Sequence, residues 1–207
     1  MNDIPLTLLA TTISAYWFGV GTLVVRLRRR THRLVGLVPE QLSERLMWLV
    51  WVPLVAAWVA LPWLAHRQRD PLFAIPDFAL LPPYPVLRWI AAAIAVACLV
   101  LTVNCWVRMG RNWRMDTSAE RPSEIITDGL FARIRHPIYA FSMLLVLCSA
   151  IIVPTLPMAV VAVVNIVLVN LKARNEERQL LASGGEEYAR YLQRTGRFVP
   201  RQVAGCC

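Results

Sequence analysis

The chain has 207 residues, of which 57% are apolar and 17% are charged, and its formal net charge is +9. Soluble domains contain roughly 45–50% apolar and about 25% charged residues, so this composition argues against a water-soluble domain and indicates an integral membrane protein. A basic excess is also typical of nucleic-acid-binding proteins. The chain nevertheless holds five strongly apolar runs, so we expect no nucleic-acid partner.

Three of the apolar runs are long enough to cross a bilayer, because about 20 helical residues span a hydrocarbon core of ~30 Å. They cover residues 4–25, 46–65 and 86–107. No basic residue precedes the first run and no small-residue cleavage site follows it. We therefore expect a retained membrane anchor there rather than a signal peptide.

Two shorter apolar runs follow, at residues 138–153 and 157–171, and the sequence Pro-Thr-Leu-Pro separates them. This arrangement predicts a tight helical hairpin. A helix of about 16 residues reaches only ~24 Å, which suits packing among other helices better than insertion alone. The sequence thus predicts an all-α fold, a bundle of five transmembrane helices that forms one domain over residues 1–207.

Basic residues gather in three of the connecting segments. Nineteen of the 22 Lys and Arg residues lie in residues 26–45, 108–137 and 172–207. The positive-inside rule predicts that these segments are cytoplasmic and that the amino terminus is outside. All but one of the basic residues are Arg, which points to a GC-rich bacterial genome and so to a bacterial inner membrane.

The five cysteines predict neither a disulfide framework nor a metal site. They form no C-x-x-C pair and have no histidine at metal-ligand spacing, and three of them lie inside apolar runs. We therefore expect no metal. The terminal Gly-Cys-Cys is similar to a prenylation signal, but such signals are easily mimicked, so whether Cys206 and Cys207 are modified stays open.

Residues 129–139 combine basic residues with Gly, His and Pro in an order that a simple charge anchor does not need. Pro137 disfavours helix at His136 and can itself begin the next helix. Arg135 and His136 would then lie at a helix start, where free N–H groups and the helix dipole favour a carboxylate or phosphate. The alternative is that Arg135 reaches lipid headgroups and His136 only caps the helix.

The fifth apolar run continues into a polar stretch without a helix breaker until Gly184-Gly185, so we expect one helix from residue 157 to about residue 182. Asn165, Lys172 and Glu176 share one face of it. A Lys and a Glu four residues apart also occur on helices simply for stability. Residues 186–192 predict a short amphipathic helix, which could equally be a lid on the membrane surface.

The ordered set of these motifs resembles one superfamily. Residues 129–139 read G-x-F-x-x-x-R-H-P-x-Y, the hairpin follows, and N-E-E at 175–177 precedes G-E-E-Y-x-x-Y at 185–191. This set resembles the isoprenylcysteine carboxyl methyltransferase and phospholipid methyltransferase superfamily over about residues 104–200. The resemblance implies methyl transfer from S-adenosylmethionine to a lipophilic acceptor. It also implies variable helices over 1–103 and a cytoplasmic cofactor pocket within 104–200.

The resemblance further implies the site residues. Those matched to cofactor binding are Ser123, Glu124, Ile125, Ile126, Phe131, His136, Pro137, Tyr139, Glu176 and Glu177, and the catalytic candidates are Lys172, Arg174 and Arg135. Two positions depart from the family pattern. Phe131 lacks the hydroxyl of the usual Tyr, and Lys172 replaces a frequent Arg, whose bidentate fork a Lys cannot reproduce. Arg174 could supply that fork.

The implied cofactor has a carboxylate that Arg135 or His136 can hold, and an ammonium and ribose hydroxyls that Glu176 or Glu177 can bind. The sequence offers no general base beyond His136, Glu176 and Glu177, which favours an acceptor that is already nucleophilic. A prenylated cysteine, an ethanolamine lipid, a quinone-like compound and a small thiol all remain open. Two other functions also remain: a sterol or enone reductase with a nicotinamide cofactor, and a non-catalytic membrane scaffold.

Overall fold

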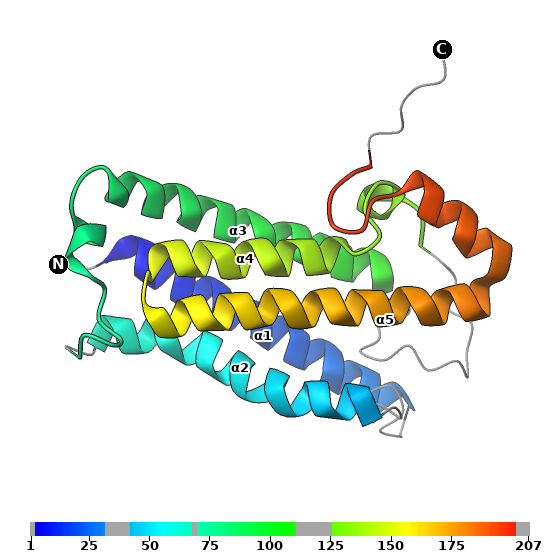
Figure 1. The fold of residues 1–207 in the computed structure, drawn as a ribbon, viewed down its shortest axis with the longest axis horizontal. Helices are drawn as coiled ribbons and strands as arrows, with labels where there is room; N and C mark the ends of the chain where they lie inside the picture. The colour runs from blue at the N-terminus through cyan, green and yellow to red at the C-terminus, as the bar shows by residue number, and fades with distance from the viewer. Residues whose placement is uncertain (1–2, 32–41, 68–69, 111–125, 202–207) are drawn as a thin grey trace, which may run out of the picture.

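The structure is a computed structural model, and it describes residues 3–31, 42–67, 70–110 and 126–201. The elements of this part of the chain are α1 (Ile4–Thr31), α2 (Leu42–Arg67), η1 (Asp77–Leu80), α3 (Tyr84–Met109), η3 (Gly129–Ala132), α4 (Pro137–Ile152) and α5 (Leu156–Arg194). The predicted all-α fold is therefore confirmed (Figure 1).

Four helices are long and apolar enough to cross a membrane: α1, α2, α3 and the part of α5 that ends at Ala182. Their exposed surfaces carry many large apolar side chains, which a bilayer can solvate. The chain is thus an integral membrane protein. α4 is apolar but has only 16 residues. The structure therefore confirms four of the five predicted spans by length, and the remaining one, α4, is a shorter helix.

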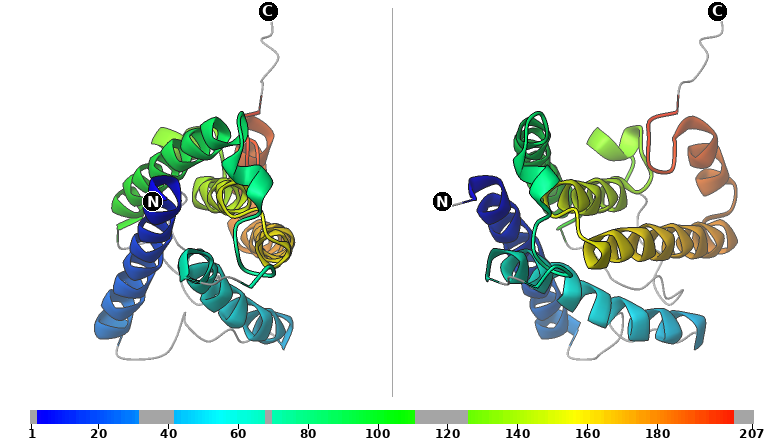
Figure 2. Two further views of the ribbon diagram at one scale, coloured as in Figure 1. Left: turned by 90° about the vertical axis from the view of Figure 1, so that its left-hand side faces the viewer. Right: turned by 60° about the vertical axis from the view of Figure 1, so that its left-hand side comes forward.

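α4 and α5 form the predicted antiparallel hairpin, with the turn at residues 153–155. α4 lies between α3 and α5, while α1 and α2 cover the other side (Figures 1 and 2). The buried face of α3 is lined with small residues, among them Ala91, Ala92, Ala95 and Cys98. Small side chains let helices approach closely, so α4 can pack tightly although it is short.

The turn end of the bundle is joined by one buried cation. Arg88 on α3 is only 4% exposed, and its guanidinium donates to an Asp3 oxygen at 2.5 Å and to the Ile152 carbonyl at 3.1 Å. Asp3 also accepts from the Leu6 N–H at the start of α1. Because the last carbonyls of a helix have no helical donor, Arg88 satisfies the end of α4 and ties it to α1.

Replacement of Arg88 should test this tie. We expect Arg88→Ala to destabilise the protein by about 3 kcal/mol, because Asp3 and the Ile152 carbonyl lose a buried donor. Arg108→Ala is the matched control, since its ion pair with Asp128 is exposed and should contribute less than about 1 kcal/mol. Thermal unfolding in detergent measures both. Equal losses for the two variants would contradict the assigned role of Arg88.

Candidate functional site

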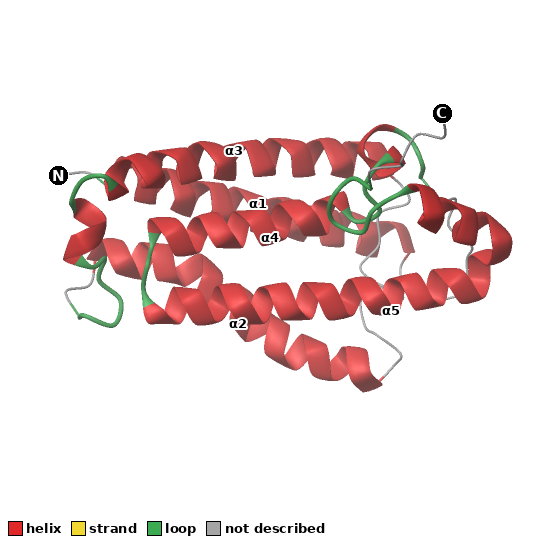
Figure 3. Ribbon diagram, turned by 45° about the horizontal axis from the view of Figure 1, so that its top comes forward, coloured by secondary structure: helices red, strands yellow, loops and turns green. Residues whose placement is uncertain are grey.

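The candidate site lies at the end of the bundle opposite the Arg88 contacts, where α5 extends past the start of α4 (Figure 1). α5 reverses direction at Gly185, whose φ of 52° and ψ of −135° are not helical. Few residues other than Gly adopt a positive φ, so the predicted interruption at Gly184-Gly185 has a clear physical cause. The last helical residues, 186–194, fold back over the start of α4 (Figure 3).

Residues 195–198, which we call the strap, then run beside residues 133–136. Gly196 and Ile134 form a parallel bridge. The Gly196 N–H donates to the Arg133 carbonyl, the Arg135 N–H to the Gly196 carbonyl at 2.8 Å, and the His136 N–H to the Arg197 carbonyl at 3.1 Å. The strap therefore fixes the backbone immediately before α4.

Glu177 on α5 holds the strap from the other side. Its carboxylate is buried and accepts from Arg135 Nε at 2.9 Å and from Arg197 Nε and Nη2 at 3.0 and 2.5 Å. Arg135 also donates from Nη1 to the carbonyls of Leu192 and Thr195. Hydrogen bonds to Glu177 raise the pKa of Arg197, so that side chain stays charged. Two guanidinium groups thus neutralise one buried carboxylate.

His136, Tyr139 and Glu176 form a second group beside this one. The Tyr139 hydroxyl donates to Glu176 Oε1 at 2.5 Å, and the rings of His136 and Tyr139 stack with centroids 5.4 Å apart. His136 Nδ1 lies 3.5 Å from Glu176 Oε2, and His136 Nε2 lies 3.5 Å from Glu177 Oε1. These distances are too long for well-formed hydrogen bonds. Nε2 is buried and makes no hydrogen bond within the described residues.

A comparison with protein families identifies the segment that carries this second group. Residues 89–182 match the model of the isoprenylcysteine carboxyl methyltransferase (ICMT) family. This segment is therefore similar to the ICMT family. It runs from α3 to the membrane end of α5 and contains His136, Tyr139, Glu176 and Glu177, whereas the strap lies outside it. A search of curated proteins gave no match to the chain.

The structure gathers about half of the residues that sequence reasoning assigned to the site. The ICMT-family segment brings His136, Pro137 and Tyr139 at the start of α4 next to Glu176 and Glu177 on α5. Phe131 is buried in η3, and its carbonyl accepts from the Tyr191 hydroxyl at 2.6 Å. Ile126 is half-buried, and Ser123, Glu124 and Ile125 lie outside the described residues.

The three catalytic candidates occupy different settings. Arg135 is engaged with Glu177 and two carbonyls, so the structure gives it a structural contact rather than an open anion-binding fork. Arg174 is exposed and lies two residues from Glu176, on a different side of α5, and its suggested role as the fork stays a prediction. Lys172 is half-buried one turn before Glu176, on the same face.

Sequence reasoning missed the residues that close the site. Arg197, Thr195 and Phe198 all contact it, since Phe198 packs against the His136 ring at 6.3 Å between centroids. Gly196 was the sequence feature that could have indicated a tight turn here. A Cβ there would lie 1.8 Å from the Val199 carbonyl oxygen, so this turn requires glycine. No motif had connected that glycine with residues more than fifty positions earlier.

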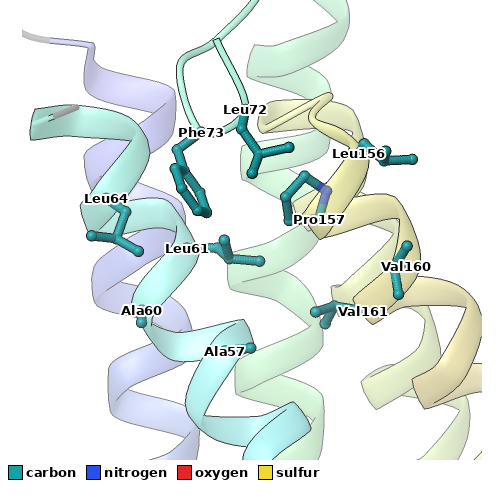
Figure 4. Close-up of a pocket in the computed structure, with 10 residues that line it drawn as sticks. All are labelled: Ala57, Ala60, Leu61, Leu64, Leu72, Phe73, Leu156, Pro157, Val160 and Val161. Atoms are coloured by element: carbon teal, nitrogen blue, oxygen red, sulfur yellow. The ribbon is translucent and has the colours of Figure 1, made fainter. Parts of the chain in front are cut away.

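The apolar pocket shown in Figure 4 is not part of this site. It has a volume of about 520 Å³ and is lined by apolar residues of α2, the 72–73 turn and the first two turns of α5. Glu176 is twenty residues beyond Leu156, or ~30 Å along α5. The side chains that line the pocket are all apolar, and none of them is one of the predicted site residues.

The last helical segment, residues 186–194, which we call the return helix, offers a pH test of this arrangement. Burial raises the pKa of Tyr191 to about 12, from an ordinary 10.0. Because the folded-state pKa is the higher one, the stability from the neutral phenol is complete below pH 10 and is lost as the pH rises from 10 to 12. We expect thermal unfolding to show this loss. Below pH 10 we expect Tyr191→Phe to be about 1 kcal/mol less stable than the unchanged protein, because it lacks the hydrogen bond to the Phe131 carbonyl. Between pH 10 and 12 the variant should lose less stability than the unchanged protein. An identical alkaline loss in that variant would contradict the assignment.

Proposed function

We propose that this chain is an S-adenosylmethionine-dependent membrane methyltransferase whose cofactor binds at His136, Tyr139 and Glu176. The observation that carries the proposal is the contact between His136 and Glu176. These residues are forty positions apart, yet their side chains lie 3.5 Å from each other within the ICMT-family segment. One small molecule can therefore touch both.

The residues present fit the cofactor. His136 Nε2 is a buried nitrogen without a hydrogen-bond partner in the described chain, which a ligand oxygen can satisfy. The N-cap residue His136 makes no side-chain cap hydrogen bond at the start of α4. The start of a helix favours a carboxylate, because its first N–H groups have no helical acceptor. Glu176 adds a carboxylate for an ammonium group. Within the described residues, no group of three His, Cys, Asp or Glu side chains could hold a metal.

Bound S-adenosylmethionine supplies an electrophilic methyl group on a positively charged sulfur. The chain's contribution is to position the reactants and to exclude water, because this kind of displacement needs alignment more than proton transfer. The rings of Tyr139 and Phe198 lie beside His136 and can enclose an adenine ring. Glu176 favours cationic groups near it and so holds the cofactor's charged end.

We propose a lipophilic acceptor that enters from the bilayer, since Glu176 and Glu177 lie near the end of the apolar span of α5, which runs to Ala182. Of the predicted catalytic residues, Lys172 remains the candidate for binding an anionic group on that acceptor, because Arg135 is held by Glu177 and Arg174 faces away. A carboxylate acceptor needs no general base. An amine or thiol acceptor would have to lose a proton first.

We also propose that this end of the bundle is cytoplasmic. The end of α1, the start of α2 and the end of α3 lie at this end of the bundle, and α1 begins at the other end (Figure 1). These helix ends border two of the three segments that contain nineteen of the 22 basic residues, and the third segment begins at residue 172 on α5. Such an arrangement places the site where a soluble nucleotide cofactor is available, in a bacterial inner membrane. A reductase is disfavoured, because the matched family is a methyltransferase family.

Methyl transfer itself is tested with purified protein, methyl-labelled S-adenosylmethionine and a total lipid extract of the source cell. We expect a labelled lipid-soluble product, whose identification names the acceptor. NADPH-dependent reduction in the same extract without methyl labelling would contradict the proposal and support the reductase.

The cofactor site is tested by substitution. We expect His136→Ala and Glu176→Ala each to weaken binding of S-adenosylhomocysteine roughly 10- to 150-fold, the effect of losing a hydrogen bond to a charged group worth ~1.5–3 kcal/mol. Glu187→Ala is a suitable control, because that carboxylate is exposed on the return helix. Titration calorimetry measures all three. Unchanged affinity in both site variants would remove His136 and Glu176 from the cofactor site.

A further inference from the structure

The strap lies outside the ICMT-family segment, yet it contacts the centre of the candidate site. Arg197 makes both of the relevant contacts. Its carbonyl accepts from the His136 N–H, and its guanidinium binds Glu177, whose Oε1 is 3.5 Å from His136 Nε2. One residue thus holds the backbone of His136 and also the carboxylate that faces its ring.

We propose that Arg197 is a positioning residue that occupies Glu177 and thereby keeps His136 Nε2 free for the cofactor. The inference rests on the proposed function, and it assigns a role in that function to a residue beyond the family segment. Arg197 acts through Glu177 and His136 and does not itself touch the reacting atoms.

The charges around His136 explain why this role is needed. Glu176 and Glu177 face the ring from α5, Tyr139 stacks on it from α4, Arg135 precedes it, and Arg197 approaches from the strap. Carboxylates on two sides compete for the imidazole nitrogens. Without Arg197, Glu177 would keep only Arg135 of its two guanidinium partners, and its Oε1 would become an acceptor for His136.

Arg is suited to this position because its planar fork binds both oxygens of one carboxylate. Nε lies 3.1 Å from Oε1 and 3.0 Å from Oε2, and Nη2 lies 2.5 Å from Oε2. Lys has a single point charge and cannot make this set of contacts. We therefore expect Arg197→Lys to retain only part of the effect.

The experiment measures the affinity of the full chain for S-adenosylhomocysteine in two series. We expect Arg197→Gln to weaken binding about tenfold in the otherwise unchanged protein, but less than about twofold in a His136→Ala background, because Arg197 acts through that ring. Adding Glu177→Gln to Arg197→Gln should restore part of the lost affinity, since the competing charge is gone. Arg201→Gln, an exposed strap neighbour that contacts the Gln193 carbonyl, should change nothing.

A purely structural strap would give different results. Arg197→Gln would then cost the same factor with and without His136, and Glu177→Gln would add to the damage instead of relieving it. Either result overturns the inference while the proposed function stands. Lack of S-adenosylhomocysteine binding by the unchanged protein overturns both. Should Arg197→Gln fail to fold, Arg197→Lys is carried through the same two series, with an intermediate loss expected.

Discussion

The site depends on the ion pairs that the buried carboxylate of Glu177 makes with two arginines. This carboxylate lies on the helix that leaves the membrane, and it is neutralised by Arg135 before α4 and by Arg197 in the strap. A charge this buried is costly unless it is paired and hydrogen-bonded, so each partner is needed for the others to stay in place. Three segments far apart in the chain are thereby brought to one point, and His136 lies at that point.

The two ends of the bundle differ in the contacts that their polar residues make. Buried polar contacts at the turn end join helices to one another, as Arg88 does for α1, α3 and α4. At the other end, α4 stops short while α5 continues, so polar side chains of α5 project beyond the start of its partner. The return helix and the strap then cover that projecting part. The site therefore requires that α4 be shorter than α5.

Patterns local in the sequence predicted most of the helices, and about half of the residues proposed for the site lie together in the structure. The apolar runs, the Pro-Thr-Leu-Pro sequence and Gly184-Gly185 predicted the helices, the hairpin turn and the interruption of α5, because each depends on neighbouring residues. The proximity of His136 and Glu176 followed from the resemblance to the methyltransferase superfamily. The strap could not be predicted, since its contacts join residues about sixty positions apart and depend on tertiary packing. For the same reason Arg135 looked like a ligand-binding residue, although Glu177 already occupies it.

Hydrogen–deuterium exchange with and without S-adenosylhomocysteine tests the central claim most directly, because it reports on all three segments in one measurement. We expect the ligand to slow exchange together at the start of α4, in α5 around Glu176 and in the strap, and we expect NADPH to have no effect. Protection confined to the opposite end of the bundle, or protection by NADPH alone, would contradict it.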